Sequence, residues 1–300
     1  MENPNHGHQP VLLAETLDLL QIEASHTIVD CTAGRGGHAQ AIGERLGTNG
    51  TLVCIDTDEK NLQYAKTRLH ALPCRRRFFH ADFGQLAEIL EIADITGVNA
   101  VLADLGVSTN QLTTEHYGLS FSVDAPLDMR LNNQSGITAA QLVNHLSEKE
   151  LADILYQNAD ERHSRRIARA LVEGRKIQPI QTTGQLAKIV RNALGRAPHG
   201  AADAATRTFQ ALRMAVNHEM ASLSSLLDAI LQIRRPAMRA VVIGFHSGED
   251  RVIKQAMRSW QQMGYGSALT KKPITPAHAE LLANPRSRSA KLRAFEFGPQ

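Results

Sequence analysis

The chain has 300 residues with a formal net charge of +3, and 43% of the residues are hydrophobic. This length and apolar content predict an ordinary globular protein with a large core, built as one big domain or as one domain with an insertion. They exclude a membrane-spanning protein, because no stretch approaches the roughly 18 uninterrupted apolar residues that a membrane helix needs. The opening stretch MENPNHGHQPVLL lacks the charged-then-apolar pattern of a secretory signal, so we expect a cytoplasmic protein.

Four short apolar runs lie in the first third of the chain, at residues 26–32, 50–56, 76–82 and 99–106. Stretches with apolar residues at helical spacing separate them, for example EKNLQYAKTRLHAL and QLAEILEIADI. Strands that alternate with helices are typical of a parallel, doubly wound sheet. The sequence therefore predicts an α/β fold.

The alternation stops after LADLGVS, and helical patterns such as AAQLVNHLSEKELADILYQ and TGQLAKIVRNAL follow turn-rich segments. About a hundred residues are too many for a simple crossover between strands. We predict an inserted, mainly helical domain over residues 111–213, with the sheet domain formed by residues 1–110 and 214–300.

The sheet is expected to resume after the insertion. Residues 208–233 predict one long amphipathic helix, residues 239–246 a buried strand, and residues 249–263 another helix. Residues 267–272 and 289–297 alternate well enough to predict a closing pair of strands.

The stretch IVDCTAGRGGHAQAI passes from an apolar strand into three glycines, Gly34, Gly36 and Gly37. In a doubly wound sheet, ligands bind beyond the carboxyl ends of the strands, where bare backbone lets a ligand approach the amides. Asp56 ends the second strand about 20 residues later, where an acid accepts hydrogen bonds from ribose hydroxyls. The pattern predicts a cofactor that contains a nucleoside. Because Gly34, Gly36 and Ala39 also satisfy the dinucleotide fingerprint, a nicotinamide-dependent dehydrogenase stays open as an alternative.

Three features favour S-adenosylmethionine as the cofactor. Asp30 precedes the glycine loop, so an acid lies near the place where a cationic methionine end would sit. The stretch HADF, residues 80–83, ends the third strand with an acid and an aromatic residue suited to an adenine. The closing pair of strands is of the kind that methyltransferase sheets use.

The cysteines and histidines point to no redox or metal chemistry. Cys31, Cys54 and Cys74 lack CxxC spacing, and we interpret Cys31 and Cys54, which fall in apolar runs, as small core residues. The histidines lack the spacing of metal ligands, which predicts that the protein has no metal site.

Nine stretches of the chain carry a resemblance to a known family. They are HQPVLLAETLDLL, DCTAGRGGHA, IDTD, LADLGVSTNQL, GLSFSVDAPLDMR, RRIARALVE, ATRTFQALRMAVNHE, GFHSGEDRVIK and NPRSRSAKLR. Together they resemble the bacterial small-subunit ribosomal RNA cytosine-N4 methyltransferases, and they run in order from about residue 8 to residue 293. PLDMR, TRTFQALR and FHSGEDR are far more specific than the glycine loop.

The resemblance implies a class I, Rossmann-like methyltransferase fold with the helical domain inserted after the fourth strand. It implies that S-adenosylmethionine donates a methyl group to the amino nitrogen of a cytidine in the decoding centre of 16S ribosomal RNA, so that the small ribosomal subunit is the partner. The cofactor contacts that it implies are Gly36, Gly37 and His38 in the loop, Asp56 at the ribose, Phe83 at the adenine, and Asp104 and Gln111 near the methyl-donating end.

The sequence also departs from the family pattern. Gly244 and Gly248 stand where the family usually has a serine and a leucine, NADE at residues 158–161 replaces Tyr-Gly-Glu-Glu, and Thr109 replaces the last serine of GVSS. These changes lie away from the cofactor loop. They leave open a divergent paralogue that methylates another cytidine or another RNA.

The chemistry of the target requires hydrogen-bond acceptors. An exocyclic cytosine amine is a poor nucleophile, so a site must hold it in line with the sulfonium methyl and accept its proton as charge develops. Asp104 and the loop to Ser108 end the fourth strand beside the cofactor turn, where such acceptors belong. Because DLGVS lacks the Pro-Pro-aromatic stretch common in methyltransferases of amino groups, we expect Phe121 or Phe245 to stack on the base, with His246 nearby.

Basic residues gather at Arg75–Arg77, at residues 162–170 and at residues 284–293, and such clusters suit a polyanion. The candidates for phosphate contacts are Arg162, Arg165, Arg166, Arg169, Arg286, Arg288, Lys291 and Arg293. The alternative for residues 162–169 is a solvated helix face on which Asp160 and Glu161 pair with the arginines.

Two other functions remain as alternatives. A methyltransferase fold that has lost turnover would bind ribosomal RNA as an assembly factor, and a hydride-transfer enzyme ranks third because nothing resembles the substrate domain of a dehydrogenase. For the assembly state, a homodimer is expected only because dimers are the commonest oligomers.

Overall fold

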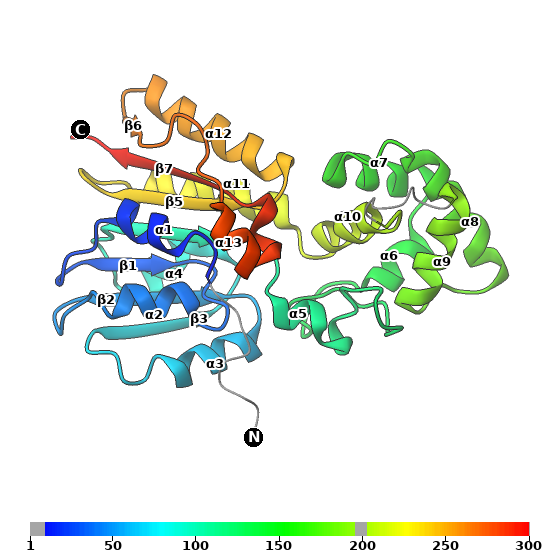
Figure 1. Cartoon of the computed structure of the whole chain (residues 1–300), viewed down its shortest axis with the longest axis horizontal. Helices are drawn as coiled ribbons and strands as arrows, with labels where there is room; N and C mark the ends of the chain where they lie inside the picture. Colours follow the sequence, from blue (N-terminus) through cyan, green and yellow to red (C-terminus); the bar gives the residue numbers. More distant parts are fainter. Residues whose placement is uncertain (1–9, 196–202, 300) are drawn as a thin grey trace. The chain divides into compact units, whose positions relative to one another are not determined.

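The computed structural model describes residues 10–195 and 203–299, and it divides into two compact units (Figure 1). The first unit comprises the chain up to Gly106 and from Ala221 onward, and the second comprises Val107–Met220.

A seven-stranded sheet forms the first unit, in the order β3-β2-β1-β4-β5-β7-β6. Its strands are β1 Thr27–Asp30, β2 Thr51–Asp56, β3 Arg75–His80, β4 Ala100–Asp104, β5 Arg239–Gly244, β6 Gly266–Ala268 and β7 Lys291–Phe297. The first five strands are parallel, and β7 runs antiparallel to both β5 and β6. The predicted α/β sheet and its closing strand pair are confirmed.

The helices of the first unit pack against this sheet (Figure 1). They are α1 Leu13–Leu20, α2 Gly37–Gly43, α3 Glu59–Arg68, α4 Leu86–Ile92, α11 Glu219–Gln232, α12 Ser247–Gln262 and α13 His278–Ala283, with 3-10 turns η1 Phe83–Gln85 and η3 Pro285–Ser289. The apolar faces of α1, α2 and α3 bury a core against strand residues such as Ile28, Leu52 and Leu102. Cys31 and Cys54 are fully buried free thiols, which confirms them as core residues.

The described residues of the second unit form helices and loops. The helices are α5 Thr109–Thr113, α6 Ala139–His145, α7 Glu148–Ala159, α8 Ser164–Ile177, α9 Thr183–Leu194 and α10 Thr206–Val216, with a 3-10 turn η2 Glu115–Tyr117. Capping boxes begin α6, α7 and α9, where Thr138, Ser147 and Thr182 pair with a Gln or Glu three residues later. Their apolar faces enclose a separate core.

The long helix expected over residues 208–233 is wrong, because the chain breaks it at Asn217 and His218. Helix α10 ends at Val216 and α11 runs from Glu219 to Gln232. His218 has a φ of +51°, a left-handed conformation that a continuous α-helix does not contain. No helix in residues 10–195 or 203–299 is long and apolar enough to cross a membrane.

Candidate cofactor site and RNA-binding residues

Three acidic residues end three neighbouring strands of the sheet. Asp30 is the last residue of β1, Asp56 of β2 and Asp104 of β4, and β1 pairs with both β2 and β4. The carboxyl ends of parallel strands meet at one edge, which is where doubly wound sheets bind their ligands. The glycine loop that follows β1 lies at this same edge.

The glycine loop requires its glycines for different reasons. Gly34 and Gly36 have φ values of +54° and +79°, a region that residues with a Cβ rarely adopt. A Cβ on Gly37 would lie 2.8 Å from Cγ of Pro10, so this position needs the space. The sequence thus closes a tight turn between β1 and α2.

Asp56 holds the glycine loop against the end of β2. Its Oδ2 accepts a hydrogen bond of 2.6 Å from the Gly34 amide, and its Oδ1 accepts one of 2.8 Å from the Asp58 amide. Burial raises the pKa of Asp56 to about 6, and the two amide hydrogen bonds oppose this rise. Each carboxylate oxygen has a further lone pair, so the predicted contact with a ribose stays compatible with these bonds.

Asp30 is buried with one oxygen unused. It is 1% exposed, and its Oδ1 accepts a hydrogen bond of 3.1 Å from the Thr32 amide. Its Oδ2 is buried without a hydrogen-bond partner in the described structure. Burial raises the pKa of Asp30 to about 7. A buried acceptor without a partner is costly, so this oxygen is suited to a donor or cation from a ligand.

Asp104 repeats this arrangement one strand away. Its Oδ1 is also buried without a hydrogen-bond partner among the described residues, while its Oδ2 lies 3.6 Å from Nδ1 of His38. Burial is the main cause that raises the pKa of Asp104 well above its usual value, and the charges of Asp30, Glu249 and Glu280 add to it. The edge therefore places two carboxyl groups with unused oxygens beside the glycine loop.

His38 is fixed by its other ring nitrogen. Nε2 lies 3.0 Å from the carbonyl oxygen of Val11, so Nε2 carries the proton that this carbonyl accepts. The histidine is 6% exposed at the start of α2. Its Nδ1 faces the carboxyl group of Asp104, and its contact with the cofactor stays a prediction.

The adenine residue that the resemblance implies, Phe83, lies at the carboxyl end of β3. It begins the turn η1, and the preceding Asp82 caps that turn with a hydrogen bond of 2.7 Å from the Gly84 amide. Asp82 also accepts a hydrogen bond of 2.9 Å from the Ser222 hydroxyl, which ties the turn to α11. The Phe83 ring is half-buried.

His246 takes a structural position at the start of α12. Its Nδ1 accepts a hydrogen bond of 3.3 Å from the Glu249 amide, and Nε2 lies 3.2 Å from Oε1 of the same residue. Glu249, which sequence reasoning missed, accepts a hydrogen bond of 2.7 Å from the Phe245 amide and is 3% exposed. A Cβ at Gly244 would lie 3.1 Å from Cβ of Glu249, so the departure at Gly244 leaves room for this acid.

Ser108 and Gln111 belong to the second unit and form the cap of α5. Oε1 of Gln111 accepts hydrogen bonds of 2.9 Å from the amide and from the hydroxyl of Ser108. Phe121 also has a role inside this unit, because it packs edge-on against Phe209 with ring centroids 4.8 Å apart. The described contacts of Phe121 are those of a core residue.

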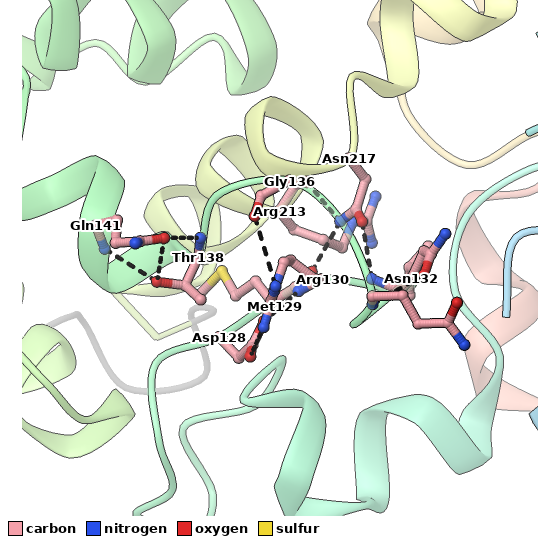
Figure 2. A network of polar contacts seen from close by, with 11 residues as sticks. Asp128, Met129, Arg130, Asn132, Gly136, Thr138, Gln141, Arg213 and Asn217 are labelled. Atoms are coloured by element: carbon pink, nitrogen blue, oxygen red, sulfur yellow. Dashed lines mark hydrogen bonds and ion pairs between the residues drawn. The ribbon is translucent and has the colours of Figure 1, made fainter.

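Two of the most specific motifs meet around Asn217, as Figure 2 shows. The Asn217 side chain donates a hydrogen bond of 2.8 Å to the Met129 carbonyl and accepts one of 2.9 Å from the Leu131 amide. Met129 has a φ of +65°, so the loop turns sharply at this point. Arg130 points back and pairs with Asp128, with Nε 2.7 Å from Oδ1. The PLDMR loop is therefore held rigidly by the residue that breaks the helix.

Arg213 and Glu219 brace this helix break from both sides. Nε and Nη2 of Arg213 donate hydrogen bonds of 2.7 and 2.8 Å to the two carboxylate oxygens of Glu219.

Asn158, one of the departures from the family pattern, donates a hydrogen bond of 3.0 Å to the Ala211 carbonyl. This position therefore has a structural use in the second unit.

The arginines at residues 162–166 are free to meet a partner. Arg162, Arg165 and Arg166 are exposed and form no ion pair within the described residues. Glu161 does not pair with them, because it is 5% exposed and accepts a hydrogen bond of 2.8 Å from the His163 amide. Arg169 differs, since its Nε lies 3.7 Å from Glu148.

The C-terminal cluster divides into exposed and bonded residues. Arg286 and Arg288 are exposed on η3. Lys291 lies 3.7 Å from Asp250, and Arg293, which is 7% exposed, donates a hydrogen bond of 2.7 Å to the same acid. The expectation that Arg293 contacts phosphate is wrong, because its charge is already buried against Asp250. In the described parts of the chain, no group of three or more His, Cys, Asp or Glu residues could hold a metal ion.

Comparison with known proteins identifies the family of the chain. The model of the MraW methylase family matches residues 5–298. The chain is 44% identical to the ribosomal RNA small subunit methyltransferase H of Acidobacterium capsulatum, over 96% of this chain and 98% of that protein. The proteins of the same name from Koribacter versatilis and Thermotoga neapolitana are 43% and 42% identical, over 96% and 99% of this chain and 93% and 98% of their own lengths. The chain therefore belongs to the MraW methylase family, which confirms the resemblance and the expectation of a methyltransferase.

Proposed function

We propose that this protein transfers the methyl group of S-adenosylmethionine to the N4 amino group of a cytidine in the decoding centre of 16S ribosomal RNA. Membership of a methylase family and relatives named as small subunit ribosomal RNA methyltransferases support the reaction and the RNA. The observation that supports S-adenosylmethionine as the cofactor is the pair of unused, buried oxygens on Asp30 and Asp104 beside the glycine loop. A cofactor with a cationic end would give both oxygens the partner that they lack.

The residues of the first unit fit this cofactor from end to end. In the proposal, Asp30 and Asp104 face the cationic methionine end, the backbone of Gly34, Gly36 and Gly37 passes beside it, and Asp56 accepts from the ribose. Phe83, at the end of the third strand, covers the adenine. The cofactor supplies an electrophilic methyl group on a positively charged sulfur.

Asp104 is the proposed catalytic residue. S-adenosylmethionine would supply the methyl group and keep the electron pair of its carbon–sulfur bond, so the cytosine nitrogen would be positive until it lost one proton. An acceptor near that nitrogen stabilises the developing charge and takes the proton. Asp104 is suited to this step because its Oδ1 is buried without a hydrogen-bond partner in the described structure, and a carboxylate of raised pKa, once ionised, is a stronger base.

Ser108 and His246 take positioning roles in this proposal. Both side chains cap helices, so we assign to them the placement of the loops after β4 and β5. Phe245, half-buried beside Gly106, is the proposed base platform, in preference to Phe121. The proposed phosphate contacts are the exposed Arg162, Arg165 and Arg166 of the second unit, and Arg286, Arg288 and Lys291 of the first.

The test is transfer of labelled methyl from S-adenosylmethionine to small ribosomal subunits purified from a strain that lacks this protein, followed by nucleoside analysis. We expect N4-methylcytidine at one site. Label in another nucleoside would overturn the proposed position. Cofactor binding without transfer would favour a divergent paralogue with another RNA, and absence of cofactor binding would favour an assembly factor.

Location and assembly complete the proposal. A substrate in the small ribosomal subunit places the enzyme in the cytoplasm. A homodimer is proposed as its assembly state, and sedimentation equilibrium would test this directly.

A further inference from the structure

The arginine cluster 75–77 lies on β3, which is the edge strand of the sheet, and the proposed function gives it no role. Among the strands of residues 10–195 and 203–299, β3 pairs only with β2, so no described strand pairs with its other side. Arg75 and Arg77 are exposed, point to the same face of the strand, and form no ion pair within the described residues.

Arg76 shows what a structural arginine looks like in the same strand. Its Nη1 donates hydrogen bonds of 2.8 and 3.1 Å to the carbonyl oxygens of Leu69 and Leu72, and it also contacts that of His70. These are carbonyls beyond the end of α3, so Arg76 satisfies the C-terminus of that helix. The side chains of Arg75 and Arg77 make no such hydrogen bonds to carbonyl oxygens within the described residues.

Helix α3 packs on the face of β3 to which Arg76 and Phe78 point, so its cations border the same sheet edge from the face opposite Arg75 and Arg77. Lys66 and Arg68 lie in its last turn, and Tyr64 is 41% exposed. Between residues 59 and 80 the chain has six lysines and arginines but only one acid, Glu59. A surface with this excess of positive charge attracts a polyanion.

Aromatic rings lie under the cations of this surface. The guanidinium carbon of Arg35 is 4.8 Å from the centroid of the Tyr64 ring, Nζ of Lys66 is 6.0 Å from that of Phe78, and the guanidinium carbon of Arg77 is 5.8 Å from that of Phe79. Such contacts hold a cation over the face of an aromatic ring. Interleaved cations and aromatic rings are typical of surfaces that bind single-stranded nucleic acid.

The surface begins at the cofactor site. Arg35 belongs to the glycine loop, and His80 at the end of β3 pairs in register with Asp56. Arg75 lies five residues before His80, which places it about 17 Å back along the strand. The basic surface therefore leads away from the site for about the length of five stacked nucleotides, at roughly 3.4 Å each.

We infer that this edge, formed by Arg35, Lys66, Arg68, Arg75 and Arg77 with Tyr64, is a second RNA-binding surface. It holds the sugar–phosphate backbone of the substrate RNA beyond the target cytidine, and it rests on the proposed function for the identity of that RNA. The first unit then binds RNA at the β3 edge as well as through the phosphate contacts proposed on η3 and at Lys291. The competing explanation is that the arginines only prevent edge-to-edge strand pairing between molecules.

The experiment compares Arg75→Gln/Arg77→Gln with the control Arg251→Gln/Arg258→Gln. The control removes the same charge from exposed positions of α12, which contacts β6 at the opposite edge of the sheet. Binding of 16S ribosomal RNA is measured over a range of salt concentrations for each protein. Two lost phosphate contacts should reduce the slope of log affinity against log salt by about 1.4, since each contact contributes about 0.7 for single-stranded RNA.

A second double variant, Lys66→Gln/Arg68→Gln, leaves the strand intact and should reduce the slope by the same amount. It keeps the test decisive if the β3 variant does not fold, which equilibrium binding of S-adenosylmethionine would reveal. Equal slopes for the wild type and a folded edge variant would overturn the inference, as would an equal loss in the control. Self-association of the β3 variant with an unchanged slope would establish edge protection instead.

Methyl transfer by the wild type separates this inference from the proposed function. If the wild type methylates small subunits but the edge variants keep its salt slope, only the second RNA surface is refuted. If the wild type methylates no RNA and binds none, both the proposed function and the inference fail.

Discussion

Replacing Asp30 by asparagine should make the protein more stable at neutral pH and a weaker binder of its cofactor. The asparagine keeps the shape and keeps an oxygen for the Thr32 amide, but it removes a carboxyl group that is 1% exposed. Burial raises the pKa of this group from 3.8 to about 7. The folded state therefore holds the proton more tightly than the unfolded state does.

The sign of the pH dependence follows from this raised pKa. The carboxyl favours the folded state fully below about pH 4, where it is protonated in both states, and this advantage is lost as the pH rises to about 7. Each pH unit in this window removes about 1.4 kcal/mol, so the total is about 4 kcal/mol. Asp30→Asn should gain up to this amount over the wild type at pH 8 and nothing near pH 4.

The chain provides its own probe for this measurement. Trp260 is its single tryptophan, is 3% exposed, and packs edge-on against Phe295 of β7, so its fluorescence reports the unfolding of the first unit. Urea unfolding of the wild type and variant is followed between pH 4 and pH 8. The matched control is Asp18→Asn, at an exposed position of α1.

The difference in stability between the wild type and Asp30→Asn should widen with pH, while the Asp18→Asn difference stays flat. Titration with S-adenosylmethionine should show at least about tenfold weaker binding to Asp30→Asn, because a hydrogen bond to a charged group is worth about 1.5–3 kcal/mol. A flat difference, or a variant that is less stable at pH 8, would refute the assignment of Asp30 as a buried, destabilising carboxyl.

Three further predictions concern other parts of the molecule. Asp104→Asn should lower methyl transfer to small subunits at least about 100-fold, as expected for loss of a proton acceptor, without a loss of stability by Trp260 fluorescence. Gly36→Ala should destabilise the first unit by about 1–2 kcal/mol, because its φ of +79° disfavours a Cβ, and cofactor titration should show weaker binding. Asn217→Ala loses three hydrogen bonds to the backbone of Met129, Leu131 and Arg213, so it should lower the free energy of unfolding by about 3 kcal/mol, measured by far-ultraviolet circular dichroism. The control is Asn192→Ala, at an exposed position of α9, which should leave this free energy unchanged. Unchanged stability of Asn217→Ala would contradict its role in holding the PLDMR loop.

The sheet and the glycine loop were predictable because their signals are local. Most of the strands are short apolar runs. The loop that follows β1 is recognised by its glycines, two of which have a positive φ in the structure. The acids that end β1, β2 and β4 can be recognised from the apolar residues that directly precede them in the sequence. Strand order then brings these acids together by the general rule for parallel sheets.

The break between α10 and α11 was not predictable from its own sequence. Residues 208–233 have a continuous helical pattern, and the break depends on bonds between Asn217 and residues 86 and 88 positions earlier in the chain. The same is true of Arg293, which appears in a basic cluster but finds Asp250, 43 positions away, as its partner. Long-range partners decide whether a polar residue is available, and composition does not reveal them.

Glu249 was missed although a local signal exists. The pattern His-x-x-Glu before α12 has the spacing of a capping box, and the glycine at position 244 leaves space for the acid. The sequence shows Gly244 only as a departure from the family pattern. In the structure the two residues are in contact, because a Cβ at position 244 would lie 3.1 Å from Cβ of Glu249.

Stability and cofactor binding are coupled at the carboxyl edge of the sheet. The unused oxygens of Asp30 and Asp104 make the ligand-free fold less stable, and the charges of Glu249 and Glu280 increase the difficulty of ionising Asp104. Glu280 is held in place by the Leu12 amide, with a hydrogen bond of 2.8 Å, so it cannot easily turn away. A cationic ligand relieves this repulsion only in the folded state, and its binding energy therefore appears as stability of the sheet. Neutral substitutions that stabilise the empty protein here must weaken that binding, since both effects arise from the same carboxyl groups.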